Sequence, residues 1–186
     1  MNKLVRIILI LLVFYIVFLG CKYSIKKMYP IKYYNIVVAN SEKYEIDPLM
    51  IMSIIRAESG FDEDATSNKN ARGLMQIRED TANWCASSLK VYNFDIQNLY
   101  NPDTNILLGT WYFNNLMKEY NGDVHLSIAA YNAGTGNVKK WLNNPEYSSD
   151  GKTLTKIPFP ETEKYINKVM NNYKIYNKLY KTGDKK

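Results

Sequence analysis

The sequence predicts a mostly α-helical fold. Apolar residues recur at helical spacing through most of residues 31–180, and no segment shows the strict alternation of apolar and polar residues that marks a half-buried strand. Turn-forming Gly, Pro, Asn and Asp residues separate the helical stretches at short intervals. With 186 residues, the chain has room for one domain and its appendages.

The first element is a strongly apolar segment at residues 7–20, preceded by the basic Lys3 and Arg6. A membrane-spanning helix needs about 20 residues, and the segment approaches that length when residues 4–21 are counted. Because basic residues precede it, the domain that follows is expected to lie outside the cytoplasm.

Three forms of this segment remain open. The favoured form is an uncleaved signal-anchor at residues 1–21, which makes the protein a single-pass membrane protein. The second form is a cleaved signal peptide, which would make the protein secreted. It is disfavoured because no clear small-x-small cleavage site follows the apolar segment. A lipoprotein would use Gly20-Cys21, although Phe18 and Leu19 fit the lipobox pattern poorly. All three forms export the domain.

The remaining chain is expected to divide into three parts. These are a basic juxtamembrane linker at 22–32, a catalytic domain at 33–180 and a basic tail at 181–186. The formal net charge of +6 suits an anionic membrane surface or an acidic cell-wall polymer as well as nucleic acid. No basic block with interleaved aromatic residues indicates a nucleic-acid site, so no such partner is expected.

The domain begins with two predicted helices. Residues 34–44 read as an amphipathic helix. Asp47 and Pro48 mark the next helix start, since Asp caps and Pro fits the first turn. This second helix, at residues 48–58, is apolar on most faces and should be buried. Gly60 is placed to end it.

A polar loop at 61–72 follows, and after it the pattern predicts helices at 73–88, 101–120, 124–132, 137–143 and from 161 onward. The core candidates of the first of these are Leu74, Met75, Ile77, Ala82 and Trp84. Gly109 lowers the stability of its helix by about 1 kcal/mol relative to Ala, which indicates close approach of another helix. Residues 144–156 read as an exposed loop that could form a flap over a cleft.

Cysteine and histidine usage limits the available chemistry. Cys21 lies at the edge of the apolar leader, so it and Cys85 do not indicate a disulfide framework. A single histidine, His125, excludes a multi-histidine zinc site and an HExxH motif. No metal and no cofactor are expected, and His125 is interpreted as a surface or packing residue.

Glu58 is the best candidate for an acid–base catalyst. It ends the buried helix, where desolvation and the negative end of the helix dipole both disfavour the ionised carboxylate and raise its pKa. A carboxyl group that stays protonated near neutral pH can donate a proton to a glycosidic oxygen. Glycosidases usually use two carboxylates. Here the nearby Asp62, Glu63 and Asp64 fall in a polar loop and are interpreted as solvated or capping.

Four motifs follow one another along the chain: Glu58-Ser59-Gly60-Phe61 with Ala65-Thr66-Ser67, Ala71-Arg72-Gly73-Leu74-Met75-Gln76, Ala130-Tyr131-Asn132-Ala133-Gly134, and Pro158-Phe159-Pro160-Glu161-Thr162-Glu163-Lys164-Tyr165. Together they resemble the catalytic signature of the soluble lytic transglycosylase family, enzymes of lysozyme-like fold that cleave peptidoglycan. Each motif alone is weak, but four in order at the family's spacing make the resemblance strong. It covers about residues 35–175.

The resemblance implies a mechanism with one acid. Glu58 would protonate the oxygen between N-acetylmuramic acid and N-acetylglucosamine. It would then act as a base on the muramyl C6 hydroxyl, which attacks the anomeric carbon and leaves a 1,6-anhydromuramyl end. A substrate hydroxyl held in place needs neither an activated water nor a protein nucleophile, which suits the missing second carboxylate.

The resemblance also implies a substrate-binding set: Ser67, Gln76, Tyr131, Asn132, Glu161 and Tyr165. Ser67 and Gln76 would hydrogen-bond the glycan near the cleavage point. Tyr131 would orient the reacting sugar or stabilise positive charge at the anomeric carbon. Asn132 would support the cleft, and the last two residues would line the wall beside Glu58. For each residue, a purely structural role in capping, loop bonding or packing is the competing interpretation.

The sequence departs from the family pattern in two places. Asn70 stands where Gly is common, and Asn tolerates the left-handed conformation that such a turn needs. Arg78-Glu79 follow Gln76-Ile77 where the family usually has Met or Thr and then Pro, which puts in doubt the family's sugar contact at position 78.

Two other functions compete with this one. A hydrolase of goose-lysozyme type would share the fold and the acid but add water. A non-catalytic glycan-binding or assembly module would not need Glu58. The expected partners are peptidoglycan glycan strands and the cytoplasmic membrane, and a monomer is expected.

Overall fold

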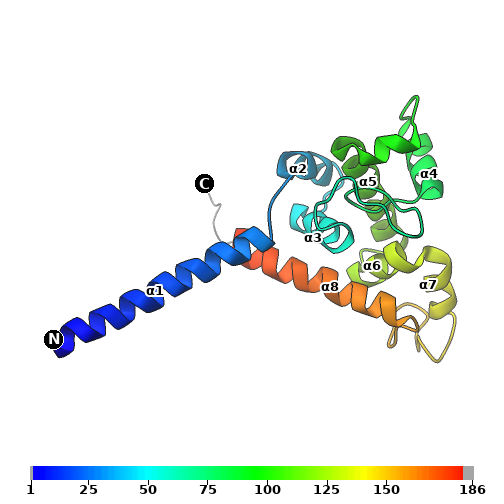
Figure 1. Cartoon of the computed structure of the whole chain (residues 1–186). Helices are drawn as coiled ribbons and strands as arrows, with labels where there is room; N and C mark the ends of the chain where they lie inside the picture. Colours follow the sequence, from blue (N-terminus) through cyan, green and yellow to red (C-terminus); the bar gives the residue numbers. More distant parts are fainter. Residues whose placement is uncertain (1, 182–186) are drawn as a thin grey trace.

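The structure is a computed structural model that describes residues 2–181, and it confirms the mostly α-helical class. A long helix, α1 (Lys3–Met28), projects from a helical domain (Figure 1). Within the described residues there are helices, turns and two isolated β-bridges, but no strand. Of the predicted basic tail, residues 182–186 lie outside the described part of the chain.

The domain helices follow in the order α2 (Tyr34–Glu42), α3 (Pro48–Glu58), α4 (Glu79–Leu89), the 3-10 helix η1 (Ile96–Tyr100), α5 (Pro102–Glu119), α6 (Val124–Ala133), α7 (Thr135–Leu142), α8 (Pro160–Tyr176) and the π-helical turn η2 (Asn177–Lys181). Every helix predicted in the domain is present, although the bounds of one are wrong. The short η1 and η2 were not predicted.

Helix α3 forms the centre of the core, as its apolar sequence predicts. All its residues from Leu49 to Ala57 are buried except Arg56. The Asp47 side chain caps it by accepting a hydrogen bond from the Leu49 N–H at 2.9 Å. Gly60, with φ +64°, directs the chain away at its other end. Helix α8 lies along α3, so the end of α3 is held against a second helix.

The helix predicted at 73–88 begins only at Glu79. Residues before it form a folded loop instead, in which Arg72 pairs by isolated bridges with both Thr66 and Ile77. Positive φ angles at Gly73 and Gln76, +71° and +49°, are incompatible with a continuous helix. The start predicted for this helix is therefore wrong.

The predicted core positions of this segment are confirmed with one exception. Leu74, Met75, Ile77 and Ala82 are buried, but Trp84 is 49% exposed, so its assignment to the core is wrong. A close neighbour is present at Gly109, since a Cβ there would collide with the Met75 side chain, but this neighbour comes from the loop before α4 and not, as predicted, from another helix.

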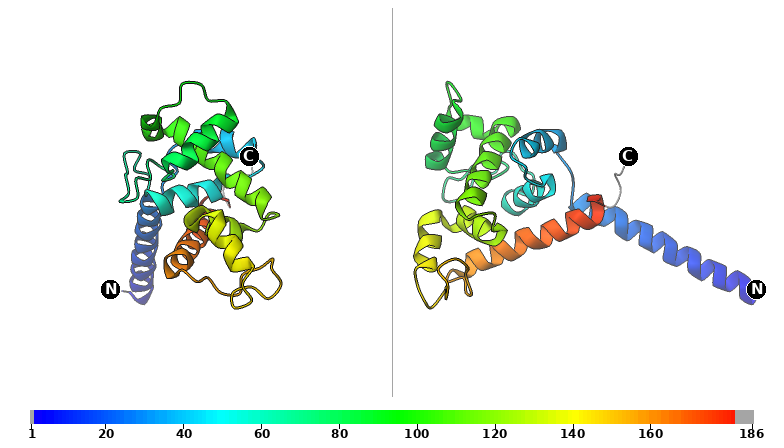
Figure 2. Two further views of the ribbon diagram at one scale, coloured as in Figure 1. Left: turned by 90° about the vertical axis from the view of Figure 1, so that its right-hand side faces the viewer. Right: turned by 180° about the vertical axis from the view of Figure 1, so that it is seen from behind.

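Helix α1 is the one helix within residues 2–181 that is long and apolar enough to cross a membrane. None of its residues is buried, and the right-hand view in Figure 2 shows it extending away from the domain. It continues to Met28, so most of the segment expected to be a linker is helical.

The end of α1 is attached to the domain through tyrosines. The Tyr176 hydroxyl donates to the Pro30 carbonyl at 2.9 Å, and the Tyr180 hydroxyl donates to the Tyr29 carbonyl at 2.6 Å. The rings of Tyr29 and Tyr176 meet edge to face with centroids 5.4 Å apart. The Arg56 guanidinium lies 4.1 Å from the Tyr29 ring centroid. This junction joins α1 to both α3 and the end of α8.

Candidate active site

Glu58 lies at the C-terminal end of α3, where α8 passes. The Tyr165 hydroxyl on α8 donates a hydrogen bond to Glu58 Oε1 at 2.6 Å. One turn further along α8, the Lys168 ammonium donates to the Ala57 carbonyl at 2.6 Å. A buried helix and a neighbouring helix therefore fix the carboxyl group in place.

Burial raises the pKa of Glu58 to about 7, and the hydrogen bond from Tyr165 and the charge of Lys168 oppose this rise. Near neutral pH the group therefore exists in both the protonated and the ionised form. Burial also raises the pKa of Tyr165 well above its usual value, so its hydroxyl stays protonated and can donate. A group poised in this way can both give and take a proton.

Glu58 borders a hollow of about 390 Å³. Its lining contains Glu58, Ser67, Lys69, Ala71, Gln76, Ile77, Arg78, Asp80, Thr81, Tyr112, Tyr131, Asn132, Ala133, Gly134 and Glu161. Five of the six residues expected to bind substrate thus lie around one hollow with Glu58, and the sixth, Tyr165, bonds to Glu58 itself.

Two of the residues expected to bind substrate, Ser67 and Gln76, also stabilise the loop that carries them through hydrogen bonds to its backbone. Ser67 Oγ accepts from the Ala71 N–H at 3.0 Å. The Gln76 side-chain amide donates to the Ala65 and Gly73 carbonyls, both at 3.0 Å. Asn70 has φ +58°, which confirms that Asn adopts the left-handed conformation in this turn.

The wall opposite the loop comes from α6 and α8. The Tyr131 hydroxyl donates to the Met75 carbonyl at 2.8 Å, and its burial raises its pKa well above the usual value. Asn132 Oδ1 accepts from the Thr162 hydroxyl at 2.8 Å, which ties α6 to α8. Glu161 lies 3.8 Å from the Lys69 ammonium, and both side chains are mostly exposed, so this pair is weak.

The other carboxylates near Glu58 have different surroundings. Asp80 and Glu161 line the hollow but are exposed, and each lies 3.8 Å from a cation. In the loop, Glu63 accepts from the Tyr33 hydroxyl at 2.6 Å and Asp62 accepts from the Asp64 N–H at 3.1 Å. None of the three loop carboxylates lines the hollow.

Several residues of the site were missed in the sequence, among them Tyr112 and Lys168. Tyr112 lines the hollow from the middle of α5, and no motif marks it. Lys168 reaches the end of α3 from α8. Its spacing of three residues from Tyr165 places it one helical turn away, and this spacing could have identified it.

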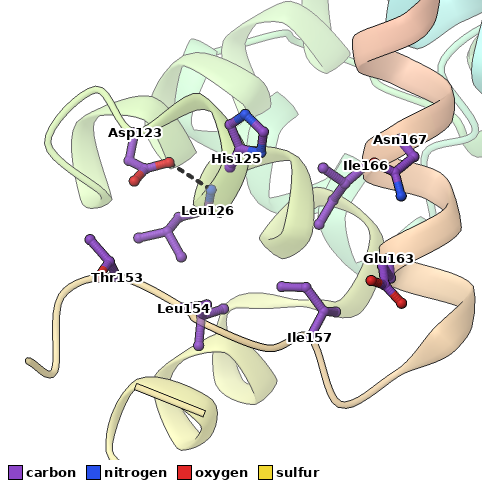
Figure 3. A pocket seen from close by; sticks show the side chains of 9 residues that line it. All are labelled: Asp123, His125, Leu126, Thr153, Leu154, Ile157, Glu163, Ile166 and Asn167. Atoms are coloured by element: carbon purple, nitrogen blue, oxygen red, sulfur yellow. Dashed lines mark hydrogen bonds between the residues drawn. The ribbon is translucent and has the colours of Figure 1, made fainter. Parts of the chain in front are cut away.

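A separate hollow of about 270 Å³ lies between α6, α8 and the loop before α8 (Figure 3). His125 lies at this hollow, and Asp123 there caps α6 by accepting from the Leu126 N–H at 2.9 Å. Thr153 and Leu154 of the loop predicted as a flap line this hollow and not the one at Glu58, and the flap itself stays a prediction. Among residues 2–181, no group of three or more His, Cys, Asp or Glu is placed to hold a metal ion.

Comparison with known proteins places this geometry in a family. Residues 35–154 match the transglycosylase SLT domain. The chain is 32% identical over 163 residues to the soluble lytic murein transglycosylase of Escherichia coli (strain K12), covering 87% of this chain and 25% of that protein. It is 30% identical over 169 residues to the membrane-bound lytic murein transglycosylase C of Edwardsiella ictaluri, covering 80% of this chain and 47% of that protein.

Solved structures are similar as well. The 70 kDa soluble lytic transglycosylase of Escherichia coli matches with a TM-score of 0.75 and 29% identity, over 87% of this chain and 26% of that one. The lytic transglycosylase Slt of Pseudomonas aeruginosa matches with a TM-score of 0.73 and 30% identity, over 84% and 25%. This similarity confirms the lysozyme-like fold class. The chain spans about a quarter of the length of the soluble relatives and about half of the membrane-bound one. Its family match covers more than half of its own residues, and it therefore belongs to the transglycosylase SLT domain family.

Proposed function

We propose that this protein is a membrane-associated peptidoglycan lytic transglycosylase. The observation that carries the proposal is the Glu58 carboxyl group, whose pKa burial raises to about 7 beside a hollow that offers no second buried carboxylate. The names of the relatives, lytic murein transglycosylases, support this reaction. The Pseudomonas aeruginosa structure is of an inactive variant in which a glutamate is replaced by glutamine, which supports dependence on one acid.

In the proposed reaction, protonated Glu58 donates its proton to the glycosidic oxygen between N-acetylmuramic acid and N-acetylglucosamine. The bond from the anomeric carbon to that oxygen breaks. The muramyl C6 oxygen then bonds to the anomeric carbon while its proton passes to the Glu58 carboxylate. Glu58 is restored, and the product is a 1,6-anhydromuramyl end with no water consumed.

The surroundings of Glu58 suit both steps. After the first proton transfer, the hydrogen bond from Tyr165 and the charge of Lys168 stabilise the carboxylate. Burial outweighs these two effects and keeps the pKa of Glu58 raised, so the carboxylate remains basic enough to take a proton back.

The remaining predicted residues would hold the glycan. We assign contacts with the sugars to Ser67, Gln76 and Tyr131, with Asn132 and Glu161 shaping the wall across from the loop. Because the Tyr131 hydroxyl bonds to the Met75 carbonyl, its ring is fixed where it could face the reacting sugar.

Helix α1 would act as an uncleaved single-pass anchor, with the domain on the extracytoplasmic side of the cytoplasmic membrane. Its length and exposed apolar surface support this role, as does the membrane-bound relative. Residues 1–21, 22–32 and 33–180 would then be anchor, juxtamembrane segment and catalytic domain of a monomer. Retention of the whole chain in washed membranes, with the domain digestible by external protease, tests this arrangement.

The test of the reaction is mass spectrometry of peptidoglycan digested by the full chain. Anhydromuramyl ends are expected, and each is lighter than a reducing end by one water. Glu58→Gln should abolish cleavage and preserve the fold. Glu63→Gln is the matched control, because that carboxylate bonds to Tyr33 outside the hollow and should be dispensable.

Three outcomes would contradict the proposal in different ways. Reducing ends alone would indicate hydrolysis of the goose-lysozyme type. Undiminished cleavage by Glu58→Gln would remove Glu58 from the mechanism. Glycan binding without cleavage by the unmodified chain would indicate a non-catalytic module.

A further inference from the structure

The hollow at Glu58 continues past Tyr112 into a second one of about 430 Å³. The two share Asp80, Thr81 and Tyr112 in their linings, so they are adjoining parts of one groove. The second part is lined by residues of α4, α5 and α7, and these helices lie on the side of the domain away from α1 (Figure 1). None of the residues expected from the sequence to bind substrate lies in it.

Trp84 is the main apolar surface of this second part. Its side chain is 49% exposed, although its spacing in α4 predicts a core residue. The rings of Trp111 and Tyr112 meet it at steep angles of 61° and 89°, with centroids 4.9 and 6.1 Å away. The two rings hold the indole in a fixed orientation, but neither stacks parallel on it. A large exposed apolar ring held rigidly in a groove is typical of a binding surface.

Polar groups lie around this ring. Glu119 and Lys139 form an ion pair of 2.7 Å, and Asn115 is oriented by its hydrogen bond to the Trp111 carbonyl at 2.8 Å. A pyranose ring has an apolar face of C–H bonds and a rim of hydroxyls and N-acetyl groups. An aromatic face with amide and charged groups beside it is complementary to such a ring.

We propose that Trp84 forms a platform for a further sugar of the same glycan strand whose cleaved bond lies at Glu58. This inference rests on the proposed function, because the strand is identified through the Glu58 cleft. Continuity of the groove supports it, since a strand leaving Glu58 past Tyr112 passes over Trp84.

A stem peptide is the competing occupant. Peptidoglycan stem peptides carry carboxylates, whereas the charged lining residues here are Asp80, Glu119 and Lys139, with one more acid than base. The only cation among them is already paired with Glu119. This arrangement disfavours an acidic peptide and favours a neutral sugar.

The test measures binding in the Glu58→Gln background, so that cleavage does not interfere. The probes are peptide-free glycan strands of short and long length, and the method is calorimetry on the full chain in detergent. Adding Trp84→Ala should weaken binding of long strands by about tenfold, equivalent to about 1.4 kcal/mol, and leave the shortest strands unaffected. Trp84→Phe should restore most of the affinity, because it keeps an aromatic face.

Tyr92→Ala is the matched control, since that side chain is 84% exposed and lines neither part of the groove. If Trp84→Ala bound long strands as tightly as the Glu58→Gln parent does, the platform would be overturned. If Trp84→Ala lost affinity only for peptide-bearing strands or free stem peptides, the surface would be assigned to the peptide. That result would also overturn the sugar platform. Because binding is measured without turnover, failure here is distinguishable from failure of the anhydro-forming reaction.

Discussion

At the scale of single residues, opposing influences on one carboxyl group define the site. Burial raises the pKa of Glu58 to about 7, while the Tyr165 hydroxyl and the Lys168 ammonium favour the ionised form. Without the first influence Glu58 would be ionised at neutral pH and could not act as an acid. Without the other two it would be a weaker acid, and its carboxylate would be less stable after proton donation.

The pH dependence of cleavage follows from this balance. Because the first step needs protonated Glu58, kcat/KM should fall as pH rises through about 7. Tyr165→Phe removes a hydrogen bond that favours the carboxylate, so the pKa of Glu58 should rise and the alkaline limb should move to higher pH. The measurement is a pH–rate profile of peptidoglycan cleavage for both proteins.

Tyr173→Phe provides the control on the same helix, because that hydroxyl bonds to Asp47 at 2.7 Å and not to Glu58. Its alkaline limb should match that of the unmodified protein. An alkaline limb that moved to lower pH in Tyr165→Phe would contradict the assigned effect of the hydrogen bond.

The raised pKa of Glu58 could be predicted from the sequence because its main cause, burial at the end of an apolar helix, is local. An apolar helix that ends in Glu can be recognised from one stretch of chain, and so can the Asp47 cap and the Gly60 stop. The opposing contacts are not local, since Tyr165 lies 107 residues from Glu58. The family resemblance predicted that Tyr165 lies beside Glu58, but nothing in the sequence indicated that its hydroxyl donates to the carboxyl group itself.

At the scale of elements, the loop before α4 depends on one buried amide. Asn105 on α5 accepts from the Met75 N–H at 2.8 Å and donates to the Arg72 and Leu99 carbonyls at 3.0 and 2.7 Å. The Met75 N–H and the Leu99 carbonyl belong to a loop and a short 3-10 helix, and the Asn105 amide supplies their hydrogen bonds. The Arg72 carbonyl also accepts from the Ile77 N–H at 3.1 Å. Asn105 therefore supports the loop that carries Gln76.

Asn105→Ala should be strongly destabilising. It leaves two buried backbone groups, the Met75 N–H and the Leu99 carbonyl, without their partner, and we expect a loss of about 2–4 kcal/mol in the free energy of unfolding. Urea denaturation measures it. Asn40→Ala is the control, because that amide makes one hydrogen bond, to the Ile36 carbonyl one turn back in α2. A loss no larger than the control's would contradict the supporting role of Asn105.

The same loop explains the error in the predicted bounds of α4. Leu74, Met75 and Ile77 are buried apolar residues close together, and in sequence they resemble the start of an amphipathic helix. The positive φ angles at Gly73 and Gln76 are stabilised by contacts with α5, which a local pattern does not contain. Trp84 was misassigned for a related reason, since helical spacing identifies a face but not whether a groove runs along it.

At the scale of the whole molecule, the junction of α1 with the domain sets how the candidate active site is held relative to α1, the proposed membrane anchor. A flexible linker would allow the domain to rotate freely. Instead, two tyrosine hydroxyls from the end of the domain bond to the backbone of residues 29–30, and Arg56 of α3 covers the Tyr29 ring. Tyr176 is fully buried at this point. The groove at Glu58 should therefore keep one orientation relative to α1.

This rigidity can be measured as a distance distribution in bilayer nanodiscs. Cys21 is exposed on α1 and Cys85 is buried, so one spin label can be placed on Cys21 and a second at Tyr92→Cys on the domain surface. The distribution of distances between the two labels should be narrow.

The double substitution Tyr176→Phe and Tyr180→Phe removes both hydrogen bonds but keeps the rings, and it should broaden the distribution. Tyr173→Phe should not, because its hydroxyl bonds within the domain. A broad distribution in the unmodified protein would contradict a rigid junction. It would mean that α1 only tethers the domain and does not fix its orientation.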